Sequence, residues 1–110
     1  MTTLEVLKAA KALLQCGWTQ GVGARTSAGV AVGSHNPLAT RFCALGALAR
    51  TTPSHAHYCT VRNVLEQHLP PGTPGVMSYN DVPTTTYADI LALFDRAIRH
   101  AKGAILEEVL

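Results

Sequence analysis

Apolar residues near the start of the chain recur at helical spacing. The segment 2–17 carries a stripe of leucines and alanines, while its lysines and a glutamine fall mostly on the opposite side. Thr2 and Glu5 have the spacing of a capping box, and Gly17 stands where a glycine commonly caps the C-terminal end. This pattern predicts a helix that begins after Thr2 and ends before Gly17.

A second helix is predicted from about Pro37 to Arg50. Asn36 is a favoured capping residue, and proline fits the first helical position. Counted from Pro37, Cys43 lies about two turns inside this helix. The glycine-rich segment before it has VGART and GVAVG on either side of Ser27-Ala28, which indicates either a short β-hairpin or an irregular loop.

Two further helices complete the pattern. After the linker TTPSHAH, a third helix is expected from about His55 to Leu69. The stretch 69–86 contains four prolines and is expected to be irregular and a candidate for function. Thr86 caps the last helix, with Asp89 in its first turn, and Gly103 marks either an end or a bend. Its apolar stripe consists of Ile90, Leu91, Phe94, Ala97, Ile98 and Ala101.

These elements predict one mainly α domain over residues 1–110, with about four helices and a short hairpin between the first two. Only 15% of the 110 residues are charged, against about 25% in an average domain. A chain this poor in charge is expected to expose an apolar patch, which favours self-association or a protein partner.

Charge and cysteine content exclude several classes of protein. The formal net charge is +2 and the nine basic residues are dispersed, which argues against nucleic-acid binding. No apolar run approaches the roughly 20 residues that span a membrane, and the first residues lack a secretory signal, so a cytoplasmic location is expected. Three cysteines without a C-x-x-C pair predict free thiols. The glycine-rich segment lacks a phosphate-loop pattern, so no cofactor is expected.

Three blocks carry a resemblance to a known family. They are GWTQG at 17–21, RFCALGAL at 41–48 and YNDVPTTTYADILALFDRAI at 79–98. In order and spacing they resemble a DUF6197-like family of uncharacterised bacterial and phage proteins, in which Trp-Asn-Asp usually opens the last block where this chain has Tyr79-Asn80-Asp81. The resemblance implies a small, mostly helical fold and an accessory or host-interaction role, and it implies no established activity.

Cys43 has two interpretations. As a nucleophile it requires a base, for which His55 and His57 are candidates, and an oxyanion donor, for which Gln20 is a candidate. The order Gln, Cys, His, Asn resembles that of papain-like proteases, whose nucleophile begins a helix, unlike the predicted position of Cys43.

The alternative for Cys43 is packing. Cys43, Gly46 and Ala47 have small side chains on one helix face, which would let two backbones approach closely. A glycine inside a helix costs about 1 kcal/mol relative to alanine, so Gly46 indicates such an approach. We therefore favour packing over catalysis at this position.

Polar residues in two separate loops form a second candidate site. Trp18 and Gln20 lie in the first loop, and Asn80 and Asp81, preceded by Tyr79, lie in the second. They indicate either a ligand cleft where the loops meet or loop architecture, with Asx-turns at Asn80 and Asp81 and the indole N–H of Trp18 bonded to a loop carbonyl.

A metal site is considered at the segment HAHYC, residues 55–59, and at His68, which supply zinc-type ligand atoms. Only His55 and Cys59 have i, i+4 spacing, and His68 is more than two turns away. We therefore predict no metal site.

The leading hypothesis is a non-enzymatic accessory protein that acts through protein contacts. The alternatives are a small cysteine-dependent hydrolase or transferase that uses Cys43, and a small-ligand binder at the Trp18 and Asn80 loops.

Overall fold

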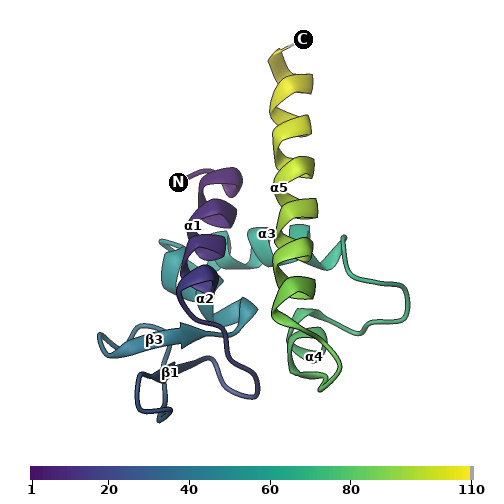
Figure 1. The fold of residues 1–110 in the computed structure, drawn as a ribbon. Helices are drawn as coiled ribbons and strands as arrows, with labels where there is room; N and C mark the ends of the chain where they lie inside the picture. The colour runs from purple at the N-terminus through teal and green to yellow at the C-terminus, as the bar shows by residue number, and fades with distance from the viewer. Residues whose placement is uncertain (110) are drawn as a thin grey trace.

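The computed structural model describes residues 1–109, with side chains described through residue 104. In its first half one helix is followed by three strands and a second helix, and helices alone make up the second half (Figure 1). They are α1 (Thr3–Cys16), β1 (Ala24–Thr26), β2 (Ala31–Val32), β3 (Ala39–Phe42), α2 (Ala44–Thr51), α3 (His55–Glu66), α4 (Val76–Asp81) and α5 (Tyr87–Val109). The structure confirms the predicted mainly α class.

The hydrophobic core lies between α1, α2, α3 and α5. In Figure 1, α1 and α5 lie side by side while α3 crosses close to both. Every helix contributes fully buried apolar side chains, which are Val6, Leu7, Ala10 and Leu14 of α1, Ala44, Ala47 and Leu48 of α2, Val61 and Leu65 of α3, Val76 of α4, and Ile90, Leu93, Phe94 and Ala97 of α5. None of the described helices is long and apolar enough to cross a membrane.

The capping signals of the two long helices are formed as predicted. Thr2 Oγ1 accepts from the backbone N–H of Glu5 at 3.1 Å, and Glu5 Oε1 accepts from the N–H of Thr2 at 3.0 Å. Thr86 and Asp89 form the same reciprocal pair at 3.1 and 2.9 Å. Gly103 does not end the last helix, since α5 continues to Val109.

The three strands form one antiparallel sheet in the order β2-β1-β3. The hairpin between the first two helices is confirmed as β1 and β2, and Gly29 in its turn has a φ of 85°. The residues that follow α1 join β3 through a parallel bridge between Trp18 and Phe42. The sheet therefore holds the segment 17–21 beside the start of α2.

The predicted helix from Pro37 to Arg50 is wrong in its first half. Asn36 caps a turn, because its Oδ1 accepts from the backbone N–H of Leu38 at 2.8 Å. The chain then extends as β3, whose backbone pairs with β1, and α2 begins only at Ala44. Asparagine followed by proline starts turns as well as helices, and here the tertiary strand pairing decides between them.

The stretch 69–86, expected to be irregular, contains the short helix α4. Gly75 precedes this helix without a side-chain capping bond, so the local sequence carries no start signal. The helix is held by tertiary contacts, since Val76 and Asn80 are buried. In addition, α3 ends at Glu66 rather than Leu69, and the described residues form five helices rather than four.

The small face of α2 packs against the loop that precedes β1. A Cβ atom added at Gly46 would overlap the backbone carbonyl oxygen of Gly23. The same oxygen accepts a hydrogen bond from the backbone N–H of Cys43 at 3.0 Å. The predicted close approach at Gly46 is confirmed, and its partner is a loop.

We predict that Gly46→Ala destabilises the protein although alanine favours helices. The added methyl group must displace the backbone of Gly23, and overpacking of this kind costs roughly 1–3 kcal/mol. Urea denaturation would measure the fall in the free energy of unfolding.

Gly103→Ala is the matched control. A Cβ atom there meets no atom within 4 Å among the described residues, so the free energy of unfolding should rise by about 0.5–1 kcal/mol. Equal stabilisation by both substitutions would show that the contact between Gly46 and Gly23 does not constrain the fold.

Candidate functional site

Three segments that are far apart in the sequence meet at the buried side chain of Asn80. Its Oδ1 accepts hydrogen bonds from Nε1 of Trp18 at 2.8 Å and from the backbone N–H of Ala44 at 3.0 Å. Its Nδ2 donates to the carbonyl oxygen of Thr19 at 3.2 Å and to Oδ1 of Asp81 at 2.9 Å. The side chain of Asn80 thus joins the loop after α1, the start of α2 and the end of α4.

Gln20 and Asp81 make further bonds between the same two loops. Gln20 Nε2 donates to the carbonyl oxygens of Asn80 and Val82 at 2.9 and 3.0 Å. Asp81 Oδ1 accepts from the backbone N–H of Gly21 at 2.9 Å. We refer to Trp18, Thr19, Gln20, Ala44, Asn80 and Asp81 together as the Asn80 network.

The polar residues singled out in the sequence are therefore brought together. The predicted Asx-turns are not how they are held, because Asn80 and Asp81 end α4 and their side chains bond across to the first loop. The indole of Trp18 bonds to a side-chain oxygen rather than to a loop carbonyl. Tyr79 is half-buried and packs against the core.

Cys43 caps α2 and does not lie two turns inside a helix. Its backbone is extended, and its Sγ accepts from the backbone N–H of Gly46 at 3.2 Å. Burial raises the pKa of the Cys43 thiol, the charge of Asp81 acts in the same direction, and the amides of Gly46 and Leu45 only partly offset them. Cys43 thus has the position of an activated thiol in an environment that keeps the thiol protonated.

A pocket of about 270 Å³ opens beside Cys43. Asp81 is the one charged residue among those that line it, and its bond to Gly21 fixes it on the pocket wall. The complete lining consists of Gly21, Val22, Gly23, Ser34, Cys43, Leu45, Gly46, Ala49, Tyr58, Met77 and Asp81.

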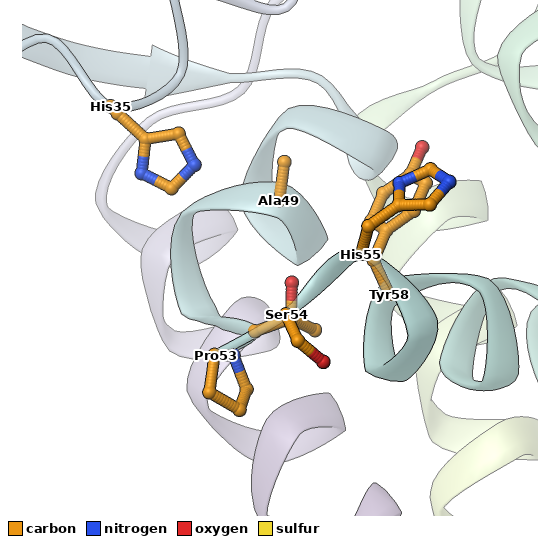
Figure 2. A pocket seen from close by; sticks show the side chains of 7 residues that line it. His35, Ala49, Pro53, Ser54, His55 and Tyr58 are labelled. Carbon is orange, nitrogen blue, oxygen red and sulfur yellow. The ribbon is translucent and has the colours of Figure 1, made fainter.

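A second pocket, of about 380 Å³, adjoins the first and shares Ala49 and Tyr58 with it. Figure 2 shows His35 and His55 on opposite sides of this pocket, with Ala49 of α2 between them. The ring of His55 stacks on Tyr58 with the centroids 6.0 Å apart. Burial raises the pKa of Tyr58, so its hydroxyl keeps its proton at neutral pH. We call the two adjoining pockets the groove.

The histidines do not complete a catalytic arrangement with Cys43. Among the described residues, no histidine lines the pocket beside Cys43. His57 lines neither half of the groove, whereas His35 and His55 line the half farther from the thiol. Gln20, the candidate oxyanion donor, uses its amide group in bonds to backbone carbonyls.

Comparison with family models identifies the chain. The model described as a family of unknown function (DUF6197) matches residues 1–100. The chain belongs to DUF6197. No curated protein and no solved structure matches it.

Two pairs of side chains of the types that can ligate a metal lie close together in this DUF6197 protein. Cys59 Sγ lies 3.4 Å from His55 Nε2, and His68 Nε2 lies 3.2 Å from His100 Nδ1. Within the described part of the chain, no group of three or more such side chains gathers. Burial, together with the nearby His100, Arg96 and Arg99, lowers the pKa of His68.

Several groove residues carry no signal in the sequence of this DUF6197 protein. Tyr58 has the spacing of a core residue on α3, and Ala49 is one of many alanines. Met77 is 63% exposed, but its surface position depends on α4, which the sequence does not predict. The signals that the sequence does carry for this surface are Cys43 and Asp81, which lie inside two of the blocks.

We predict that Asn80→Ala destabilises the protein by roughly 2–4 kcal/mol. It removes the one oxygen that accepts from the N–H groups of both Trp18 and Ala44, and a buried donor left without a partner costs about 1–3 kcal/mol. Urea denaturation would measure the loss. Asn63→Ala, at an exposed position of α3, is the matched control and should be neutral or slightly stabilising.

We also predict that Cys43 in the native protein reacts with iodoacetamide at least about tenfold more slowly than the exposed Cys16. Burial restricts access and favours the unreactive thiol form. Site-resolved mass spectrometry at pH 8 would give both rates, which should become similar in urea. Rapid native alkylation of Cys43 would instead support the cysteine-dependent enzyme.

Proposed function

We propose that this DUF6197 protein is a non-enzymatic binding module that takes an extended segment of a partner protein in the groove. The observation that carries the proposal is the continuity of the two pockets through Ala49 and Tyr58. Both pockets are open to solvent rather than enclosed, and a surface that binds a peptide segment is expected to be open in this way. This role fits the accessory or host-interaction function that the family resemblance implies.

The chemistry of the groove suits a peptide. Leu45, Ala49 and Tyr58 supply apolar surface, and Met77 is an adaptable and exposed side chain at the edge. Asp81 gives this end of the groove a negative charge, so we expect the partner to place a cationic side chain there. The Asn80 network holds the walls in place before binding, which lowers the entropic cost of association.

Binding is better supported than catalysis at this site. The thiol of Cys43 is buried, its pKa is raised, and the residues that line its pocket include no histidine base. A small-ligand site at the Trp18 and Asn80 loops is also less favoured. The carboxamide of Asn80 already makes the two bonds at oxygen and the two at nitrogen that it can make.

A second surface supports protein contacts of another kind. Val30 and Leu38 are 59% and 69% exposed and line a hollow of about 620 Å³ beside the sheet. None of the described residues that line it is charged. Self-association through this sheet surface is the alternative to partner binding in the groove.

Peptides selected from a random display library on the immobilised protein would test the groove. We predict that Ala49→Arg, which fills the groove where its two halves meet, weakens binding of selected peptides by at least about tenfold, or 1.4 kcal/mol. Asp81→Asn should weaken the binding of basic peptides and reduce its dependence on salt. Fluorescence polarisation would give the dissociation constants.

Ala12→Arg, at an exposed position of α1, is the matched control and should leave binding unchanged. Peptides that bind Ala49→Arg as well as the wild type would contradict the proposal, as would a selection without binders. Binding that is lost only in Leu38→Asp would move the contact to the sheet surface.

A further inference from the structure

Basic side chains from two helices meet at a hollow between α1 and α5. The two helices lie side by side and run in opposite directions (Figure 1). The hollow has a volume of about 300 Å³, and its lining consists of Lys8, Lys11, Asp95, Ile98, Arg99 and Lys102. Four of the nine lysines and arginines of the chain therefore gather at one place, although they are dispersed along the sequence.

The spacing of these residues on each helix explains why they meet. Lys8 and Lys11 are three residues apart on α1, so they share a face of that helix. Arg99 and Lys102 have the same spacing on α5, and Asp95 precedes Arg99 by one turn. Lys11 Nζ lies 2.6 Å from Asp95 Oδ1, and this ion pair joins the two faces.

One carboxylate does not balance the cations of the hollow. Lys11 with Asp95 is the one ion pair among the side chains that the structure describes. The other three cations, Lys8, Arg99 and Lys102, are exposed. Four positive charges and one negative charge give the hollow a net charge of +3, whereas the formal net charge of the whole chain is +2. The positive charge of the protein is thus concentrated at this surface.

The remaining arginines do not extend the hollow into a long basic stripe. Arg25, Arg50 and Arg96 donate to backbone carbonyl oxygens elsewhere in the fold. Duplex nucleic acid carries one negative charge per about 1.7 Å of its axis and favours a basic stripe. A compact hollow with the apolar side chain of Ile98 among its lining residues instead suits a short run of carboxylates on a polypeptide.

We propose that the hollow between α1 and α5 binds an acidic segment of a partner protein. Neighbouring aspartate or glutamate side chains of this segment pair with Lys8, Arg99 and Lys102. Exposed ion pairs are individually weak, so binding depends on several of them together and falls as salt rises. The hollow shares no lining residue with the groove, so this site goes beyond the proposed function of the groove.

Titration of the isotope-labelled full chain with an oligoglutamate peptide, followed by NMR, tests the site. The largest shifts of backbone amides should fall in the segments 8–11 and 95–102, which line the hollow. The shifts should disappear at about 1 M salt, where the Debye length is only about 3 Å.

Two arginine variants with the same change in charge separate the hollow from net charge alone. Arg99→Gln and Arg41→Gln each remove one positive charge from an exposed arginine, but Arg41 lies on β3 outside the hollow. Arg99→Gln should raise the dissociation constant of the peptide about threefold, as expected for the loss of one exposed ion pair. Arg41→Gln should leave the dissociation constant unchanged.

The other charges of the hollow give two stronger tests. The triple variant Lys8→Gln, Arg99→Gln and Lys102→Gln should raise the dissociation constant at least about tenfold, because three ion pairs are lost. Asp95→Asn should lower the dissociation constant, because it removes the one carboxylate of the hollow and releases Lys11 for the peptide.

The proposal is overturned if the oligoglutamate does not bind, or if Arg99→Gln and Arg41→Gln weaken binding equally. A DNA duplex or phosphatidylserine vesicles that shift the same amides at lower concentrations than the peptide would also overturn it, and would assign the hollow to nucleic acid or to membranes. These outcomes do not depend on peptide binding in the groove, because the shifts are read at residues of α1 and α5.

Discussion

The carboxamide of Asn80 is the interaction on which the site depends. It is fully buried, and its four hydrogen bonds reach three segments that are far apart in the sequence. These segments are the loop after α1, the start of α2 and the end of α4. A buried amide that lacked any of these partners would be strongly unfavourable, so the segments are positioned as one unit. The chain carries few charges, and here a neutral carboxamide joins segments that ion pairs join in other proteins.

The elements with local signals could be predicted from the sequence. The capping pairs of α1 and α5 and the hairpin of β1 and β2 are encoded within a few neighbouring residues. The start of α2 could not be predicted, because Asn36-Pro37 begins a turn whose continuation is decided by pairing with β1. In the same way α4 has no cap of its own and depends on the burial of Asn80.

The correction at α2 changes the chemistry expected of Cys43. At the start of a helix, backbone amides such as that of Gly46 point at the sulfur and favour the thiolate. Removal of water from the buried side chain disfavours the same thiolate, and the carboxylate of Asp81 adds to this effect. Burial and the Asp81 charge together outweigh the backbone amides, so the pKa of the Cys43 thiol is raised. A position typical of a nucleophile therefore holds a protonated thiol here. Position on a helix therefore does not establish reactivity without the environment of the sulfur.

Each of the three sequence blocks that carry the resemblance supplies residues to the lining of the groove, but the blocks do not supply most of it. Hydrogen bonds to one another and to the backbone occupy the polar groups of Trp18, Gln20 and Asn80. These residues therefore set the shape of the groove wall. Cys43, Leu45 and Asp81 of the blocks line one half of the groove, whereas Tyr58 and Met77 come from parts of α3 and α4 outside the blocks. A fixed wall combined with separately placed contact residues would allow one fold to receive different segments, because the contacts could vary without disturbing the network.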